Sequence, residues 1–126
     1  MAIFRYINTT SKATIMNLRS RLEEIEYIIE IIPEKLLLGK IQYWAKDILG
    51  FFPDLSDTDP SAKYIKDNSS HFFIQASKHS ENYFKEPFYD SKKGSSIYPS
   101  NLASNSFKRG VKYLREHLRQ IPDASA

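Results

Sequence analysis

The chain has 126 residues, with 18 basic and 15 acidic side chains and a formal net charge of +3. This length suits one domain with one hydrophobic core. The absence of cysteine excludes disulfides, a thiol nucleophile and a cysteine-based zinc site. No segment resembles a secretory signal, and charged and glycine residues interrupt the most apolar stretch, residues 36–52, too often for it to span a bilayer. We therefore expect a soluble, cytoplasmic protein with a single domain over residues 1–126.

The first predicted helix carries a heptad pattern. Residues 1–10 are expected to form an N-terminal arm or a short strand, with Thr10 or Ser11 as the N-cap of the helix that follows. Pro33 ends this helix, because a proline inside a helix lacks the N–H and clashes with the preceding turn. Apolar residues alternate at steps of three and four, which is typical of a helix that packs lengthwise on another helix. They are Ile15, Leu18, Leu22, Ile25, Ile29 and Ile32.

Two further helices are predicted before residue 87. Pro33 and Glu34 suit a helix N-terminus, and Gly50 with the following Pro53 marks the end of this second helix. Its apolar face is formed by Leu37, Leu38, Ile41, Trp44, Ala45 and Ile48. After a loop over residues 54–60, a third helix is expected over residues 61–86. Its apolar side holds Ile65, Phe72, Ala76 and Tyr83, with the polar Ser69 and His79 between them. This interruption predicts a break near residues 68–70.

A long loop and a last helix complete the pattern. Residues 87–101 are rich in Pro, Gly and Ser and are expected to form an ordered loop. The last helix is predicted over residues 102–121, with a frayed tail over residues 122–126. The fold class is therefore all-α, a helical bundle of four to five helices with one long loop. Its predicted core consists of Leu18, Leu22, Ile25, Ile29, Leu37, Ile41, Trp44, Ile48, Phe72, Val111, Leu114 and Leu118.

Catalytic and metal-binding patterns are weak in this sequence. The three histidines, His71, His79 and His117, lack the Glu-x-x-His or His-x-x-x-His spacing that brings two metal ligands to one helix face. The acidic residues between positions 54 and 59 lack the spacing of a calcium loop. Arg115 and His117 are two residues apart and fall on different faces of a helix, which disfavours a nuclease site. We expect no enzymatic activity, no metal and no cofactor.

The charge is concentrated near the C-terminus. Residues 91–126 carry seven basic and two acidic side chains. On the last helix, cations follow a stripe about 60° wide beside the apolar face. We call Lys108, Lys112, Arg115 and Arg119 the basic strip. No acidic residue interrupts it, and Lys92 and Lys93 extend it, so the sequence predicts a site that follows a nucleic acid backbone. A solvated helix face explains the same charges without any ligand.

The chain resembles the small subunit of CRISPR effector complexes. The resemblance rests on size, the lack of cysteine, the all-helical pattern and a basic strip on a terminal helix. It implies a helical bundle that packs in copies within a larger nucleoprotein assembly and contacts a single strand or a heteroduplex without reading sequence. It also implies that the basic strip faces phosphates. Exposed aromatic residues between positions 72 and 98 are further candidates for base stacking.

The alternative function is a helical protein–protein interaction module, either a homodimer or an inhibitor or immunity-type protein that docks on one target. Arg19 and Glu26 both fall at e positions of the heptad. An antiparallel pair of such helices would match opposite charges between copies. Packing of this helix within its own chain accounts for the same pattern.

Overall fold

The computed structural model describes residues 2–55, 60–85 and 99–121, and within them the chain is an all-α helical bundle, as predicted. Four α-helices and one 3₁₀-helix account for these residues. They are α1 (Ala2–Ile31), α2 (Glu34–Phe51), η1 (Phe52–Leu55), α3 (Pro60–Lys85) and α4 (Pro99–Leu118). The predicted tail at residues 122–126 and most of the predicted 87–101 loop lie outside the described residues.

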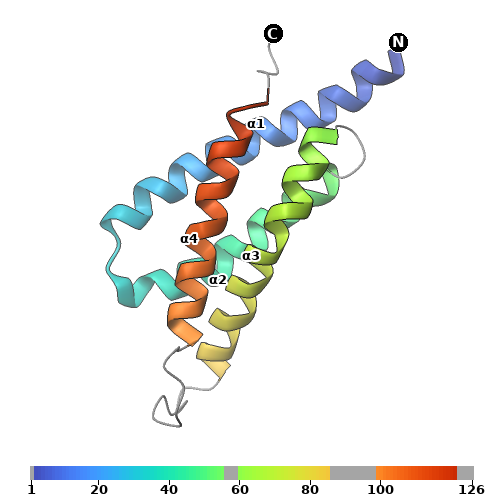
Figure 1. The fold of residues 1–126 in the computed structure, drawn as a ribbon. Coiled ribbons are helices and arrows are strands. Elements are labelled where there is room, and N and C mark those ends of the chain that lie inside the picture. The colour runs from blue at the N-terminus through green and yellow to red at the C-terminus, as the bar shows by residue number, and fades with distance from the viewer. Residues whose placement is uncertain (1, 56–59, 86–98, 122–126) are drawn as a thin grey trace.

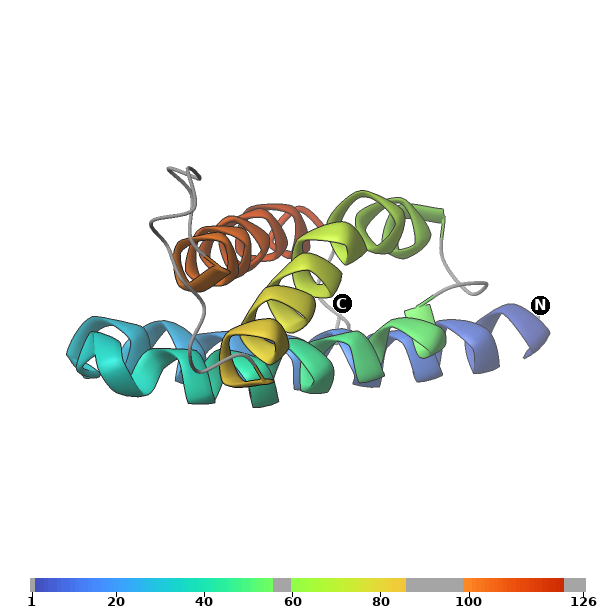
Figure 2. The ribbon, with the colours of Figure 1, turned by 90° about the horizontal axis from the view of Figure 1, so that it is seen from below.

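The helices form two layers. Figures 1 and 2 show α1 and α2 running side by side in opposite directions, with α3 and α4 packed across them as a second antiparallel pair. Aromatic rings join the layers at the centre. Trp44 of α2 stacks on Phe107 of α4 with ring centroids 5.8 Å apart, and Phe73 of α3 meets Phe107 edge-on at 5.9 Å. Phe52 of η1 meets Phe73 at 6.0 Å, which closes the cluster from the α2 side.

The N-terminal helix is longer than the sequence pattern suggests. We expected an arm or strand over residues 1–10, but α1 begins at Ala2, so this prediction is wrong. The segment contains no proline or glycine, so the helix continues through the Thr and Ser residues that resemble N-caps. At the other end, Pro33 separates α1 from α2 as predicted, and it is the N-cap residue of α2.

The third helix is continuous, contrary to the predicted break near residues 68–70. Its buried stripe passes through two serines that are fully buried, Ser69 and Ser80. The Ser69 hydroxyl donates to the Ile65 carbonyl at 2.7 Å, and the Ser80 hydroxyl donates to the Ser77 carbonyl at 3.0 Å. Because the helix itself satisfies these hydroxyls, their burial costs little, and the stripe continues where apolar periodicity fails.

Small residues bring α3 and α4 close together. A Cβ added at Gly110 of α4 would lie 2.7 Å from Cζ of Phe73 and 2.9 Å from Cβ of Phe72. Both distances are well inside van der Waals contact, so only glycine fits. Phe73 belongs to the buried stripe of α3 and is fully buried, whereas Phe72 is half-buried at the outer edge of the α3–α4 contact.

The predicted core is correct except at two positions. Ten of its twelve residues are buried, whereas Phe72 and Ile29 are half-buried. Helix α4 begins at Pro99 and ends at Leu118, three residues earlier at each end than predicted. Proline suits the first turn of a helix, which explains the earlier start.

Candidate nucleic-acid interface

The amphipathic pattern of α4 fixes the position of the basic strip. Phe107, Val111, Leu114 and Leu118 point into the core. All four cations of the strip are exposed along one flank of this buried face, with Arg119 just beyond the last residue of α4. The structure therefore brings these four predicted site residues together. Lys92 and Lys93, predicted to extend the strip, lie outside the described residues.

An acidic edge of α1 runs beside the strip. Arg115 Nη1 lies 3.4 Å from Glu26 Oε2, and both side chains are partly exposed. The expectation that the strip has no acidic partner is therefore wrong for Arg115. The two residues are 89 positions apart, so their contact depends on how α1 and α4 pack, which periodicity along one helix does not reveal.

Two shallow hollows follow this contact. The larger, of about 200 Å³, is lined by Glu26, Ile29, Glu30, Lys108, Val111, Lys112 and Arg115. The smaller, of about 120 Å³, is lined by Arg19, Leu22, Glu23, Glu26, Arg115, Leu118 and Arg119. Glutamates of α1 thus form one wall and the basic strip forms the other. An anion bound in these hollows is attracted by the cations of α4 and repelled by the carboxylates of α1.

Arg19 binds the C-terminal end of α4. Its guanidinium Nη2 donates to the Leu118 carbonyl and, at 3.1 Å, to the Ile121 carbonyl. A cation at the last carbonyls of a helix complements the negative end of the helix dipole. Arg19 and Glu26, the e-position residues considered for matching between two copies, therefore both contact the α4 end of their own chain.

Aromatic rings line the outer contact between α3 and α4, a feature that sequence reasoning missed. We call His71, Phe72, Tyr113 and His117 the aromatic seam. Tyr113 and His117 stack with centroids 3.8 Å apart, Phe72 lies 6.4 Å from Tyr113, and His71 lies 4.0 Å from Phe72. The guanidinium carbon of Arg109 lies 5.8 Å from the centroid of Phe72, within cation–π range.

The signal for this seam is the four-residue spacing of Arg109, Tyr113 and His117, which places them on one face of α4. His117 Nδ1 lies 2.9 Å from the Tyr113 carbonyl, so this nitrogen carries the proton that it donates. Burial, followed by the neighbouring Tyr64, raises the pKa of Tyr113 above its usual value. Tyr113 therefore remains a neutral hydroxyl across the physiological pH range and adds no negative charge to α4.

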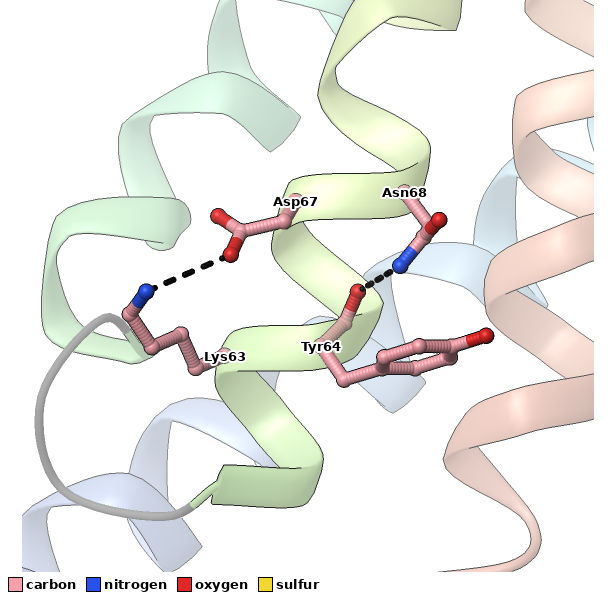
Figure 3. Close-up of polar contacts among 4 residues, drawn as sticks. All are labelled: Lys63, Tyr64, Asp67 and Asn68. Carbon is pink, nitrogen blue, oxygen red and sulfur yellow. Dashed lines mark hydrogen bonds and ion pairs between the residues drawn. The ribbon is translucent and has the colours of Figure 1, made fainter.

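Tyr64 extends the seam toward the C-terminal end of α4. Figure 3 shows its ring projecting from α3 toward the neighbouring helix, while the Asn68 amide donates to the Tyr64 carbonyl at 2.7 Å. Lys63 and Asp67 form an ion pair at 3.4 Å on another side of the same turn. The ring borders a hollow of about 380 Å³, lined by Pro60, Ser61, Tyr64, Ile65, His117, Gln120 and Ile121.

His71 and His117 belong to the aromatic seam, and His79 lies apart from it on α3. His79 Nε2 lies 3.0 Å from Gln75 Oε1 on α3, whereas His117 belongs to the seam on α4. Among the residues that the structure describes, no three His, Asp or Glu side chains gather closely enough to hold a metal ion. Within the same residues, none of the helices combines the length and apolar character needed to cross a bilayer.

Comparisons with protein-family models, with curated proteins and with solved structures gave no match for this chain.

Proposed function

We propose that this protein contacts a nucleic acid backbone through α4, independently of sequence, as a non-catalytic subunit of a larger nucleoprotein assembly. The exposed basic strip carries this proposal. Lys108, Lys112 and Arg119 form no ion pair with any residue in the described ranges, and Arg115 has only its 3.4 Å contact with Glu26. Cations spaced along one flank of a helix suit a run of phosphates, each of which releases counterions when it is neutralised.

The charge of the surrounding surface supports the same function. Helices α3 and α4 carry eight basic and three acidic residues, whereas α2 and the part of α1 from Lys12 onward carry six of each. The basic excess therefore lies on the layer that holds the strip. Electrostatic attraction therefore brings an anionic polymer to the α3–α4 layer in preference to the α1–α2 layer.

The aromatic seam favours a single strand as the ligand. Unpaired bases stack on aromatic side chains, and every base offers a face for stacking. Phe72 and Tyr113 are half-buried, so part of each side chain remains accessible. The rings lie on the α3 side of α4 and the strip lies on its α1 side, so a strand that uses both would cross the exposed outer face of α4. The resemblance to small subunits of CRISPR effector complexes agrees with this mode of binding.

The test is a titration with a labelled single-stranded oligonucleotide at several salt concentrations. Replacing Lys112 and Arg115 together by Gln should weaken binding to all sequences alike. It should also lower the slope of log affinity against log salt by about one to two, because roughly one counterion is released per phosphate contact. Stability should barely change, since the buried face of α4 is untouched.

Two control variants sharpen this test. Glu26→Gln removes the carboxylate that competes for Arg115, so it should tighten binding, opposite to the strip variant. Lys35→Gln with Lys40→Gln removes two exposed cations from α2, in the other layer, and should leave affinity nearly unchanged. A parent protein that ignores oligonucleotides at low salt, alone and within any complex it forms, would refute the proposal and favour a module that docks on a protein target.

A further inference from the structure

The outward face of the α1–α2 layer exposes large apolar side chains. Tyr27 and Ile31 of α1 are 68% and 65% exposed, and Leu36 and Tyr43 of α2 are 61% and 63% exposed. Tyr27 and Ile31 are four residues apart, and Leu36 and Tyr43 are two turns apart, so each pair shares one side of its helix. The buried residues of both helices face the second layer. We call Tyr27, Ile31, Leu36 and Tyr43 the outer apolar patch; on each helix it lies on the side opposite the buried residues.

A helical glycine beside this patch has no explanation within the fold. Gly39 is exposed inside α2, and a Cβ added there would meet nothing within 4 Å. Glycine in a helix interior costs about 1 kcal/mol relative to alanine. At Gly110 of α4 a close contact with α3 offsets this cost, whereas Gly39 makes no such contact within its own chain. A helix from outside that packs against α2 between Leu36 and Tyr43 would use the space that Gly39 leaves.

The charges around the patch separate by helix. Every exposed charged side chain that the structure describes on α1 is acidic, and these are Glu23, Glu24 and Glu30. Glu23 and Glu30 lie on the flank of α1 that also borders the hollows beside the basic strip. Three of the four exposed charged side chains on α2 are basic, namely Lys35, Lys40 and Lys46, with Glu34 at the first turn as the exception. An acidic helix and a basic helix that lie side by side form a surface that is complementary to itself.

We propose that a second copy of this chain docks on the outer apolar patch and forms a symmetric dimer. A two-fold axis that runs along the α1–α2 layer places α1 of each copy on α2 of the other. Glutamates then meet lysines on both sides of the axis, and the exposed Tyr, Ile and Leu side chains pack between them. This arrangement leaves the basic strip and the aromatic seam of both copies facing outward.

Complementary charge reversal tests the pairing directly. One variant carries Glu24→Lys and Glu30→Lys on α1, and the other carries Lys35→Glu and Lys40→Glu on α2. Each variant alone brings like charges together across the axis and should be monomeric by analytical ultracentrifugation at micromolar concentration. An equimolar mixture should sediment as a heterodimer, because the altered α1 of one variant faces the altered α2 of the other. Dimeric single variants, or a mixture that stays monomeric, would overturn this pairing.

Apolar variants test the patch itself. Leu36→Glu with Tyr43→Glu should convert the dimeric parent to a monomer with an unchanged far-UV circular dichroism spectrum. Ile74→Glu is the matched control, because Ile74 is 51% exposed on α3, outside the patch, and its replacement should leave the dimer intact. If the double variant unfolds, Tyr43→Glu alone replaces it. A parent that is monomeric over the whole concentration range would overturn the proposal.

Discussion

The two layers of this bundle are built in different ways. Helices α1 and α2 bury mainly leucine and isoleucine, with Trp44 as the largest side chain. Seven of the thirteen buried residues on α3 and α4 are Ala, Ser or Gly. Large side chains fill space between helices, whereas small ones let two helix backbones approach. The first layer thus gains stability from apolar area, and the second gains a tight helix pair whose outer contact displays aromatic rings.

The layers also differ in charge. In the first layer an ion pair joins neighbouring helices, where Arg21 Nε lies 3.0 Å from Asp47 Oδ2 between α1 and α2. That contact brings opposite charges together without the alignment of a hydrogen bond. Of the four exposed cations on α4 and Arg119 just beyond it, only Arg115 forms an ion pair with a described residue. Exposed cations without a partner are common on protein surfaces, but a row of them along one flank of a helix suits a ligand that carries a run of phosphates.

The largest expected effect is the loss of a core aromatic ring. Phe73→Ala should lower the free energy of unfolding by about 3–5 kcal/mol, and Leu22→Ala in the other layer by about 2–5 kcal/mol, because each leaves a cavity in a packed core. Urea denaturation measures both. Phe72→Ala is the control for the first variant and should cost clearly less, since Phe72 is only half-buried. Equal costs at residues 72 and 73 would contradict the assignment of Phe73 to the core.

A smaller effect distinguishes two helical glycines, Gly110 of α4 and Gly39 of α2. Gly110→Ala should destabilise the protein by about 1–3 kcal/mol, because the new methyl group overlaps Phe73 and Phe72 and overpacks the contact. Gly39→Ala meets no atom of its own chain within 4 Å, so it should stabilise the monomer by up to about 1 kcal/mol through helix propensity. The comparison requires urea denaturation of both variants under identical conditions. A neutral Gly110→Ala would mean that α3 and α4 separate easily.

The difference between the layers also explains what the sequence could predict. Apolar periodicity identifies the buried faces of α1, α2 and α4, because Leu, Ile and Trp mark them directly. It fails on α3, where Ser69 and Ser80 are core residues whose hydroxyls bond to their own helix. Phe72 and Phe73 are adjacent, and Phe73 is the buried ring because it lies four residues after Ser69 and three before Ala76 on the buried stripe of α3.

The candidate interface also has one part that the sequence predicts and one part that depends on how the helices pack. Spacing along α4 places the four cations of the basic strip on one flank, so the strip could be predicted from the sequence of this helix alone. The Glu26–Arg115 contact and the pairing of Phe72 with Tyr113 join residues from distant parts of the sequence. Such contacts follow from how the helices pack and not from any local pattern. The prediction of an arm at residues 1–10 was wrong for a different reason: Thr and Ser, which it interpreted as N-caps, also occur inside helices.

The smallest expected effect tests the electrostatics of the basic layer through His79 on α3. Burial, followed by the charge of Lys78, lowers the pKa of His79 from its usual value of 6.5. Between the lowered pKa and 6.5 the unfolded chain binds more protons than the folded one, so stability rises with pH across this window. The contribution is complete above pH 6.5 and is lost as the pH falls toward the lowered value. His79→Gln should therefore reduce the loss of unfolding free energy on acidification, measured by urea denaturation at several pH values.

A second variant separates the two causes of the lowered pKa of His79. Lys78→Gln should raise the NMR titration midpoint of His79 only part of the way back to 6.5, because burial is the larger cause. A midpoint that does not move would show that solvent screens the lysine charge at this position, and that the excess of cations on this layer has little effect on the pKa of its own side chains.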